Sequence, residues 1–200
     1  MRVIRGCVTI IGIVSVLAIV TVLMAYYLYS LSPRIRAQMV PVAVTAEAAQ
    51  SLDQKIETLE TEIDEAVAAG QEREMSFVVT EKELNSKLIE LLAEGELQLN
   101  EVLVNFREGY FLVYAVVDVP GVAARMGAKG HLQVVDGDAK VLIEDFDLGK
   151  LPMPQSANSG IEQLLDIMIS LKLADLPLEL TGIEINNGEL TASGLVKTAD

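Results

Sequence analysis

The chain has 200 residues, of which 51% are hydrophobic, and its formal net charge at pH 7 is −14. An acidic chain is a poor ligand for nucleic acid, because affinity there depends on neutralising phosphates, so we expect no nucleic-acid partner. The single cysteine, Cys7, excludes disulfides and thiolate metal sites from the rest of the chain. Stability must therefore come from an ordinary apolar core.

Residues 8–31 carry no charged side chain, and all 29 acidic residues follow them. A helix over residues 8–25 would be roughly 27 Å long, close to the roughly 30 Å hydrocarbon core of a bilayer. The run is longer than the apolar region of a cleaved signal peptide, and it ends in tyrosines, which favour the headgroup layer. We therefore predict a cytoplasmic stub over residues 1–7 and an uncleaved, single-pass membrane anchor over residues 8–31.

Arginines flank both ends of this predicted span, so the positive-inside rule gives only a weak bias. Arg2 and Arg5 precede the span, and Arg34 and Arg36 follow it. Because the N-terminal stub is too short to be the working part, we expect a cytoplasmic N-terminus and an extracytoplasmic C-terminal body.

Residues 32–44 contain Pro33 and Pro41 and predict a linker. Residues 45–70 then predict an amphipathic helix that ends at Gly70, because apolar residues recur at alternating spacings of four and three. These residues are Leu52, Ile56, Leu59, Ile63 and Ala66. Two interpretations stay open: a short coiled coil that joins two copies through Leu52, Ile56, Leu59 and Ile63, or a stripe that packs on its own domain. Under both interpretations, we expect the helix to act as a stalk that holds the domain away from the membrane.

Residues 71–200 predict one extracytoplasmic α+β domain. A strand at residues 76–79 leads into a helix that Thr80 and Glu83 open as a capping box and that ends near residue 94. Three hairpins are expected within residues 97–119, 131–147 and 178–196, and a second helix is expected at about residues 160–173. Because no βαβ alternation occurs, we predict a curved, mainly antiparallel sheet of about six to seven strands, packed on one or two helices.

The sequence has none of the common catalytic motifs, such as G-x-S-x-G, H-E-x-x-H or a Gly-rich phosphate loop. His131 is the only histidine, and a lone histidine without partner ligands is not a metal site. The Asp136-Gly137-Asp138 run fits turn chemistry better than a calcium loop. We expect a protein that is not an enzyme, with no catalytic residue, no metal and no cofactor.

The most informative pattern is an excess of apolar side chains. The strand at residues 110–119 is apolar on both faces, and the predicted helix at residues 160–173 is apolar around its whole circumference. Both faces of that strand must therefore be covered. Either helices cover them in a packed core, or a curved sheet and the apolar helix enclose a groove for an acyl chain. The candidate groove residues are Leu112, Tyr114, Val116, Met126, Met153, Met168 and Ile169.

Several of these features together resemble the YpmS-like anchored envelope proteins and, more distantly, the LmeA-like phospholipid-binding domains. They are the N-terminal anchor, the T-x-x-E-L-N helix start at residues 80–85, the successive hairpins, and the G-K-L-P-x-P loop at residues 149–154. The resemblance covers roughly residues 76–196. It implies a tubular-lipid-binding type of fold, in which a curved antiparallel sheet wraps a helix and lines an apolar channel, and it implies no catalytic residues.

Two functions follow as expectations. The first is a membrane-anchored, extracytoplasmic module that binds or transfers a lipid or other apolar ligand in the cell envelope. The second is a structural or assembly protein that dimerises or docks on a partner through the helix at residues 45–70.

Overall fold

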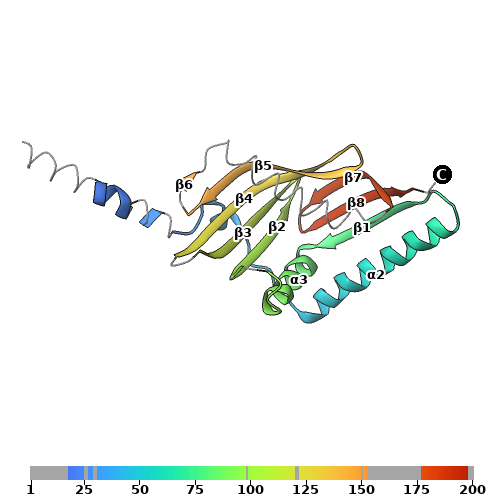
Figure 1. Cartoon of the computed structure of the whole chain (residues 1–200), viewed down its shortest axis with the longest axis horizontal. Helices are drawn as coiled ribbons and strands as arrows, with labels where there is room; N and C mark the ends of the chain where they lie inside the picture. The colour runs from blue at the N-terminus through green and yellow to red at the C-terminus, as the bar shows by residue number, and fades with distance from the viewer. Residues whose placement is uncertain are drawn as a thin grey trace, which may run out of the picture.

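The computed structural model of the chain describes residues 18–24, 27–28, 31–97, 99–119, 122–149, 151–152 and 177–197. These residues form an α+β fold with two antiparallel sheets, as the sequence predicts for the fold class (Figure 1). The elements in chain order are η1 Ile35–Gln38, α2 Ala46–Ala68, β1 Glu74–Thr80, α3 Glu81–Ala93, β2 Glu101–Arg107, β3 Tyr110–Val119, β4 Val122–Val135, β5 Asp138–Leu148, β6 Leu151–Pro152, β7 Leu178–Asn186 and β8 Glu189–Val196.

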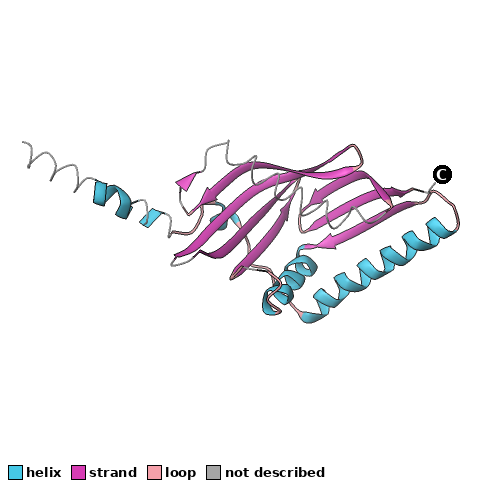
Figure 2. Cartoon of the chain, in the orientation of Figure 1, coloured by secondary structure: helices cyan, strands magenta, loops and turns pink. Residues whose placement is uncertain are grey.

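The strands divide into two sheets, whereas the sequence predicted a single sheet of six to seven strands. Sheet A has the order β1-β8-β7, and sheet B has the order β2-β3-β4-β5-β6. Sheet B is a meander, because each strand pairs with the next one along the chain. Sheet A joins β1 to the C-terminal hairpin, a pairing between distant parts of the sequence. Figure 2 shows the two sheets side by side, with α2 and α3 on one side of them.

The hairpins lie where the turn residues predict them, with one difference in length. The turn between β4 and β5 consists of Asp136 and Gly137, both with positive φ, as a two-residue hairpin turn requires. However, β4 begins at Val122, well before the predicted start at His131. Part of the predicted Pro-containing loop forms β6, a two-residue strand paired with β5.

The predicted helix at residues 45–70 is confirmed as α2, and Thr45 caps its first turn by accepting a hydrogen bond from the Ala48 N–H. The stalk role is not confirmed. Ile63 and Ala66 are buried against Met75 of β1 and Val196 of β8. The helix therefore contributes to the core of the domain, which corresponds to the second of the two interpretations of its apolar stripe.

The four residues proposed as a dimer seam differ in exposure. Leu52 and Ile63 are buried within the chain itself, and Leu59 is partly buried. Ile56 is 39% exposed. A second copy could reach Leu52 and Ile63 only if α2 left its own domain, so a homodimer through this seam stays a prediction that competes with the observed packing.

The predicted linker at residues 32–44 is also part of the domain. It contains η1, and both Ile35 and Met39 are buried on sheet B. Arg34 anchors the segment, because its guanidinium Nη2 lies 2.7 Å from the Oδ1 of Asp147, a fully buried carboxylate of β5. The segment is short and has no helical or strand periodicity, so nothing local distinguishes it from a true linker.

Two predicted helices fall largely or wholly outside the described ranges. Within residues 8–31, the structure describes residues 18–24 and 27–28, which are helical, and residue 31, which is not. Across the described part of the chain, no helix combines the length and the apolar character that crossing a membrane requires. The predicted apolar helix at residues 160–173 lies outside the described residues.

Candidate functional site

A continuous apolar surface covers the face of both sheets on which α3 packs, called here the inner face. On sheet B it is formed by alternate residues of β2, β3 and β5, and on sheet A by the β7–β8 hairpin. Leu84 and Leu88 of α3 cover part of it. The buried members are Val104, Phe106, Phe111, Val141, Ile143, Phe146 and Ile185. This surface is the largest of the three buried apolar clusters among the described residues.

The inner face of sheet A borders a cavity of about 200 Å³. Leu59 of α2 lies on one side of the cavity, and Leu132 and Ala139 from the β4–β5 hairpin lie on another. The strands of sheet A supply the remaining lining residues: Met75, Phe77, Leu178, Leu180, Ile183, Leu190, Ala192, Ser193 and Gly194. Among the described residues, Ser193 is the only lining residue with a polar side chain. The cavity is therefore suited to a hydrocarbon group and offers almost nothing to a polar ligand.

The cavity exists because β8 carries small residues where its neighbours carry large ones. Leu190, Ala192 and Gly194 alternate along β8 and face the cavity, whereas Phe77 and Ile183 lie beside Ala192 in the register. Of the lining residues, only Leu59 was singled out from the sequence, as part of the predicted dimer seam and not of a ligand site. The decreasing side-chain size along one face of β8 is a signal that could have indicated a space there.

The predicted groove residues lie elsewhere, and the structure does not bring them together. Leu112, Tyr114 and Val116 form a second buried cluster on the outer face of sheet B, where Ile35 and Met39 cover them. Met126 lies on the inner face, because it pairs with Ala115, whose side chain points away from those three. Both faces of β3 are covered, as predicted, but the outer face is covered by the N-terminal segment. Met153, Met168 and Ile169 lie outside the described residues.

Tyr114 marks the centre of the outer cluster and is surrounded by charges. Burial raises the pKa of its hydroxyl, and the nearby Glu101 carboxylate raises it further, while Arg125 acts in the opposite direction. The Arg36 guanidinium lies 5.2 Å from the centre of the Tyr114 ring. These contacts tie the segment that follows the predicted anchor to the outer face of sheet B.

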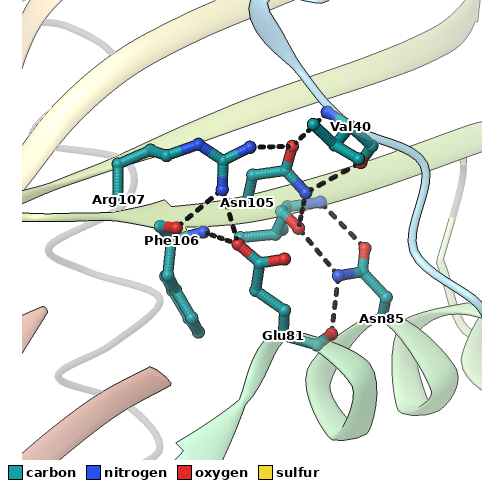
Figure 3. Close-up of polar contacts among 7 residues, drawn as sticks. Val40, Glu81, Asn85, Asn105, Phe106 and Arg107 are labelled. Atoms are coloured by element: carbon teal, nitrogen blue, oxygen red, sulfur yellow. Dashed lines mark hydrogen bonds and ion pairs between the residues drawn. The ribbon is translucent and has the colours of Figure 1, made fainter. Parts of the chain in front are cut away.

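Asn85 of α3 closes the outer edge of β2 (Figure 3). Its side-chain Nδ2 donates to the Val104 carbonyl at 2.7 Å, and its Oδ1 accepts from the Val104 N–H at 2.8 Å. The same Nδ2 donates to the Glu81 carbonyl at 2.7 Å. Asn85 is 1% exposed, so its amide replaces a neighbouring strand for one residue of β2.

Asn105, a residue of β2 itself, pairs in the same way with the backbone of Val40 in the N-terminal segment (Figure 3). Its Oδ1 accepts from the Val40 N–H at 2.7 Å, and its Nδ2 donates to the Val40 carbonyl at 3.1 Å. Arg107 connects the two asparagines, because it donates to Asn105 Oδ1 and to the Glu81 carboxylate, which also accepts from the Phe106 N–H. The network joins α3 and the segment around Val40 to β2, so its hydrogen bonds position these elements.

Glu83 is the most strongly perturbed carboxylate among the described residues. Burial raises its pKa, but hydrogen bonds from Lys55, Thr80 and Ser51 outweigh this effect and hold the pKa at about 2. The Lys55 Nζ lies 2.8 Å from the carboxylate, and the Ser51 hydroxyl donates to it at 2.7 Å. This ion pair joins α2 to α3, and its carboxylate stays charged at neutral pH.

The remaining polar cluster lies on the outer face of sheet B around Glu144, the extra residue of a β-bulge between β4 and β5. The Lys129 Nζ lies 2.6 Å from one Glu144 oxygen, and the His131 Nδ1 lies 3.4 Å from the other. Within the described ranges, no three His, Cys, Asp or Glu side chains are grouped so that they could hold a metal ion.

Comparison of the chain with protein-family models, with curated proteins and with solved structures finds no match.

Proposed function

We propose that this protein is a membrane-anchored, non-enzymatic domain of the cell envelope that binds an apolar ligand, namely the hydrocarbon chain of a lipid. The observation that supports this proposal is the cavity of about 200 Å³ between sheet A, α2 and the β4–β5 hairpin. Its lining is apolar except for Ser193. The uncharged run at residues 8–31 and the resemblance to the YpmS-like anchored envelope proteins favour a position at a membrane, where such chains are abundant.

The size of the cavity limits what it can hold. Apolar cavities of roughly 150 Å³ stay dry and accept a benzene-sized molecule, whereas drug-sized ligands occupy roughly 300–1,000 Å³. A cavity of about 200 Å³ therefore has room for one end of an acyl chain. The rest of the chain can lie along the inner face of sheet B, where Met126, Leu132 and Leu148 are only partly buried.

The test uses the full chain in its own membrane and a fatty acid that carries a photoactivatable diazirine near its methyl end. After irradiation, mass spectrometry of the digested protein identifies the labelled peptides. We expect label on the peptides that contain Leu132 and Leu190, which line the cavity. Label confined to residues 8–31 would contradict the proposal, because it would mean that the probe meets the protein only within the bilayer.

A cavity-filling variant separates ligand binding from folding. Ala192→Leu adds hydrocarbon inside the cavity, so it should lower the labelling of these peptides while the melting temperature stays the same or rises. Thr191→Leu is the matched control, because Thr191 is the next residue of β8 and its side chain lies on the opposite face. Unchanged labelling in Ala192→Leu would count against this cavity as the binding site.

A further inference from the structure

The outer edge of β1 is an open strand edge. Val196 donates to the Arg73 carbonyl and Glu81 donates to the Gly188 carbonyl, so the odd-numbered residues of β1 are those that bond to β8. The N–H and C=O groups of Glu74, Ser76 and Val78 therefore point away from sheet A. The Lys55 ammonium donates to the Val78 carbonyl at 3.0 Å. No described residue is a hydrogen-bond partner of the outward groups of Ser76.

The chain itself covers part of two other strand edges, those of β2 and β7. The edge of β2 is bonded by the side chains of Asn85 and Glu81. The edge of β7 is met by two hairpin turns of sheet B, since Gly109 donates to the Ile185 carbonyl and Leu180 donates to the Gly137 carbonyl. Open strand edges are prone to pairing with other chains, and proteins usually cover them. Within the described residues, the outward backbone groups of Ser76 have no such cover.

A groove of about 450 Å³ runs between this edge and α2. Its floor and one wall are the backbone and side chains of Ser76, Phe77 and Val78. The opposite wall is the face of α2 that carries Ser51, Gln54, Lys55, Thr58, Leu59 and Glu62. The groove therefore combines unpaired backbone donors and acceptors with a mixed polar and apolar wall, as strand-addition sites do.

The surroundings of the groove are acidic. Five acidic residues follow Lys55 on α2 without an intervening base, and none of them forms an ion pair with a described residue: Glu57, Glu60, Glu62, Asp64 and Glu65. Lys55 itself is paired with Glu83. Glu72 and Glu74 flank Arg73 at the start of β1. A positively charged partner is attracted here, whereas the same edge of a second copy would be repelled.

We propose that the outer edge of β1 and the adjoining groove bind an extended, basic peptide segment of another protein, which adds to sheet A as a further strand. The backbone groups of Glu74 and Ser76, with the N–H of Val78, supply the hydrogen bonds. Glu62 and its acidic neighbours on α2 select for Lys and Arg in the partner. This docking site adjoins the apolar cavity on the inner face of the same sheet, because Leu59 and Phe77 line both.

The test measures the fluorescence anisotropy of a labelled peptide of alternating Lys and Val with the full chain in phosphatidylcholine nanodiscs. Ser76→Pro removes the outward N–H of Ser76, while Ser76→Ala keeps it. We expect Ser76→Pro to weaken binding about tenfold or more, the equivalent of losing a backbone hydrogen bond and the fit of its neighbours. Ser76→Ala should bind like the original chain. Equal affinities of the two variants, with unchanged melting temperatures, would overturn the proposal.

A second measurement does not depend on how the variants fold. The same peptide with N-methyl groups on its central residues cannot donate backbone hydrogen bonds along a strand edge. The original chain should therefore bind it at least about tenfold more weakly. A peptide of alternating Glu and Val should not bind, and raising NaCl from about 50 to about 500 mM should weaken the Lys peptide. Equal binding of the methylated peptide would show attraction by charge alone and would overturn strand addition. Dimers of the chain that Ser76→Pro abolishes would instead assign the edge to a second copy.

Discussion

Single side chains satisfy backbone hydrogen-bonding groups that have no partner in a helix or a sheet. Asn85 and Asn105 each pair with both polar groups of one backbone residue, and both are almost fully buried. The Thr80–Glu83 capping box was predictable, because its two members are three residues apart and its pattern is local. The role of Asn85 was not, because its partner Val104 is brought to it only by the tertiary fold.

The Glu83 carboxylate should stabilise the fold in a pH-dependent way. Its pKa is about 2, below the ordinary value of 4.5, so its contribution is complete above pH 4.5 and is lost as the pH falls toward 2. Glu83→Gln keeps the shape but removes the charge, and should lower the free energy of unfolding by about 1–3 kcal/mol at pH 7. The check is the melting temperature of both proteins across this pH range, where the difference should shrink on acidification.

Glu90→Gln is the matched control for this experiment, because Glu90 lies on the same helix and pairs with Lys87 at the surface. Exposed pairs of this kind contribute little, so the control should melt within a few degrees of the original chain. A difference between Glu83→Gln and the original chain that stays constant from pH 7 to pH 2 would contradict the assigned pKa.

The elements that differ most from the sequence-based predictions are the two segments that were predicted to lie outside the domain and are packed on it. Residues 33–40 begin with Pro33 and are followed by Pro41, which together predict a turn or linker. The segment is also too short for a periodic pattern, so its burial could not be inferred locally. For α2, the a/d stripe was predicted, but the same stripe fits a coiled coil or packing on a sheet. Only long-range contacts with Met75 and Val196 decide between the two.

Gly127 of β4 allows the N-terminal segment to lie flat on sheet B. A Cβ atom at this position would lie 2.9 Å from the Cβ of Pro33 and 3.1 Å from the Cβ of Ile35. Gly127→Ala should therefore lift the segment from the sheet while leaving the strands paired, at a cost of about 1–3 kcal/mol. We expect trypsin to cleave after Arg34 and Arg36 about tenfold faster, as followed by mass spectrometry of the full chain in nanodiscs.

Gly182→Ala is the control for this prediction, because a Cβ atom at Gly182 would meet nothing within 4 Å. Its cleavage after Arg34 and Arg36 should match that of the original chain. If Gly127→Ala is also cleaved at the original rate, the segment does not depend on this close contact.

At the scale of the whole molecule, the fold class and the hairpins could be predicted, but the division into two sheets could not. Turn residues and alternation predict which strands are neighbours along the chain. They carry no information on the pairing of β1 with β8, which separates sheet A from sheet B. The candidate cavity lies between parts that are distant in sequence, so its residues could not be recognised without that pairing.

The predicted topology can be tested with cysteine labelling, because Cys7 is the only cysteine and lies in the predicted cytoplasmic stub. A second cysteine introduced as Gln71→Cys occupies an exposed position just after α2. In intact cells, a membrane-impermeant maleimide should label this position in a Cys7→Ser background. The original Cys7 should react only after permeabilisation. The reverse pattern would place the C-terminal domain in the cytoplasm.

The pairing of β1 with β8 also has a consequence for how the protein is made. Translation produces β1 long before β8, which lies near the other end of the described chain. Until β8 emerges from the ribosome, β1 lacks its one strand partner in the sheet and neither of its edges is paired, while the meander of sheet B can already form from neighbouring strands. Sheet A is therefore completed only after β8 has been made, and β1 is open to pairing with other strands during that interval.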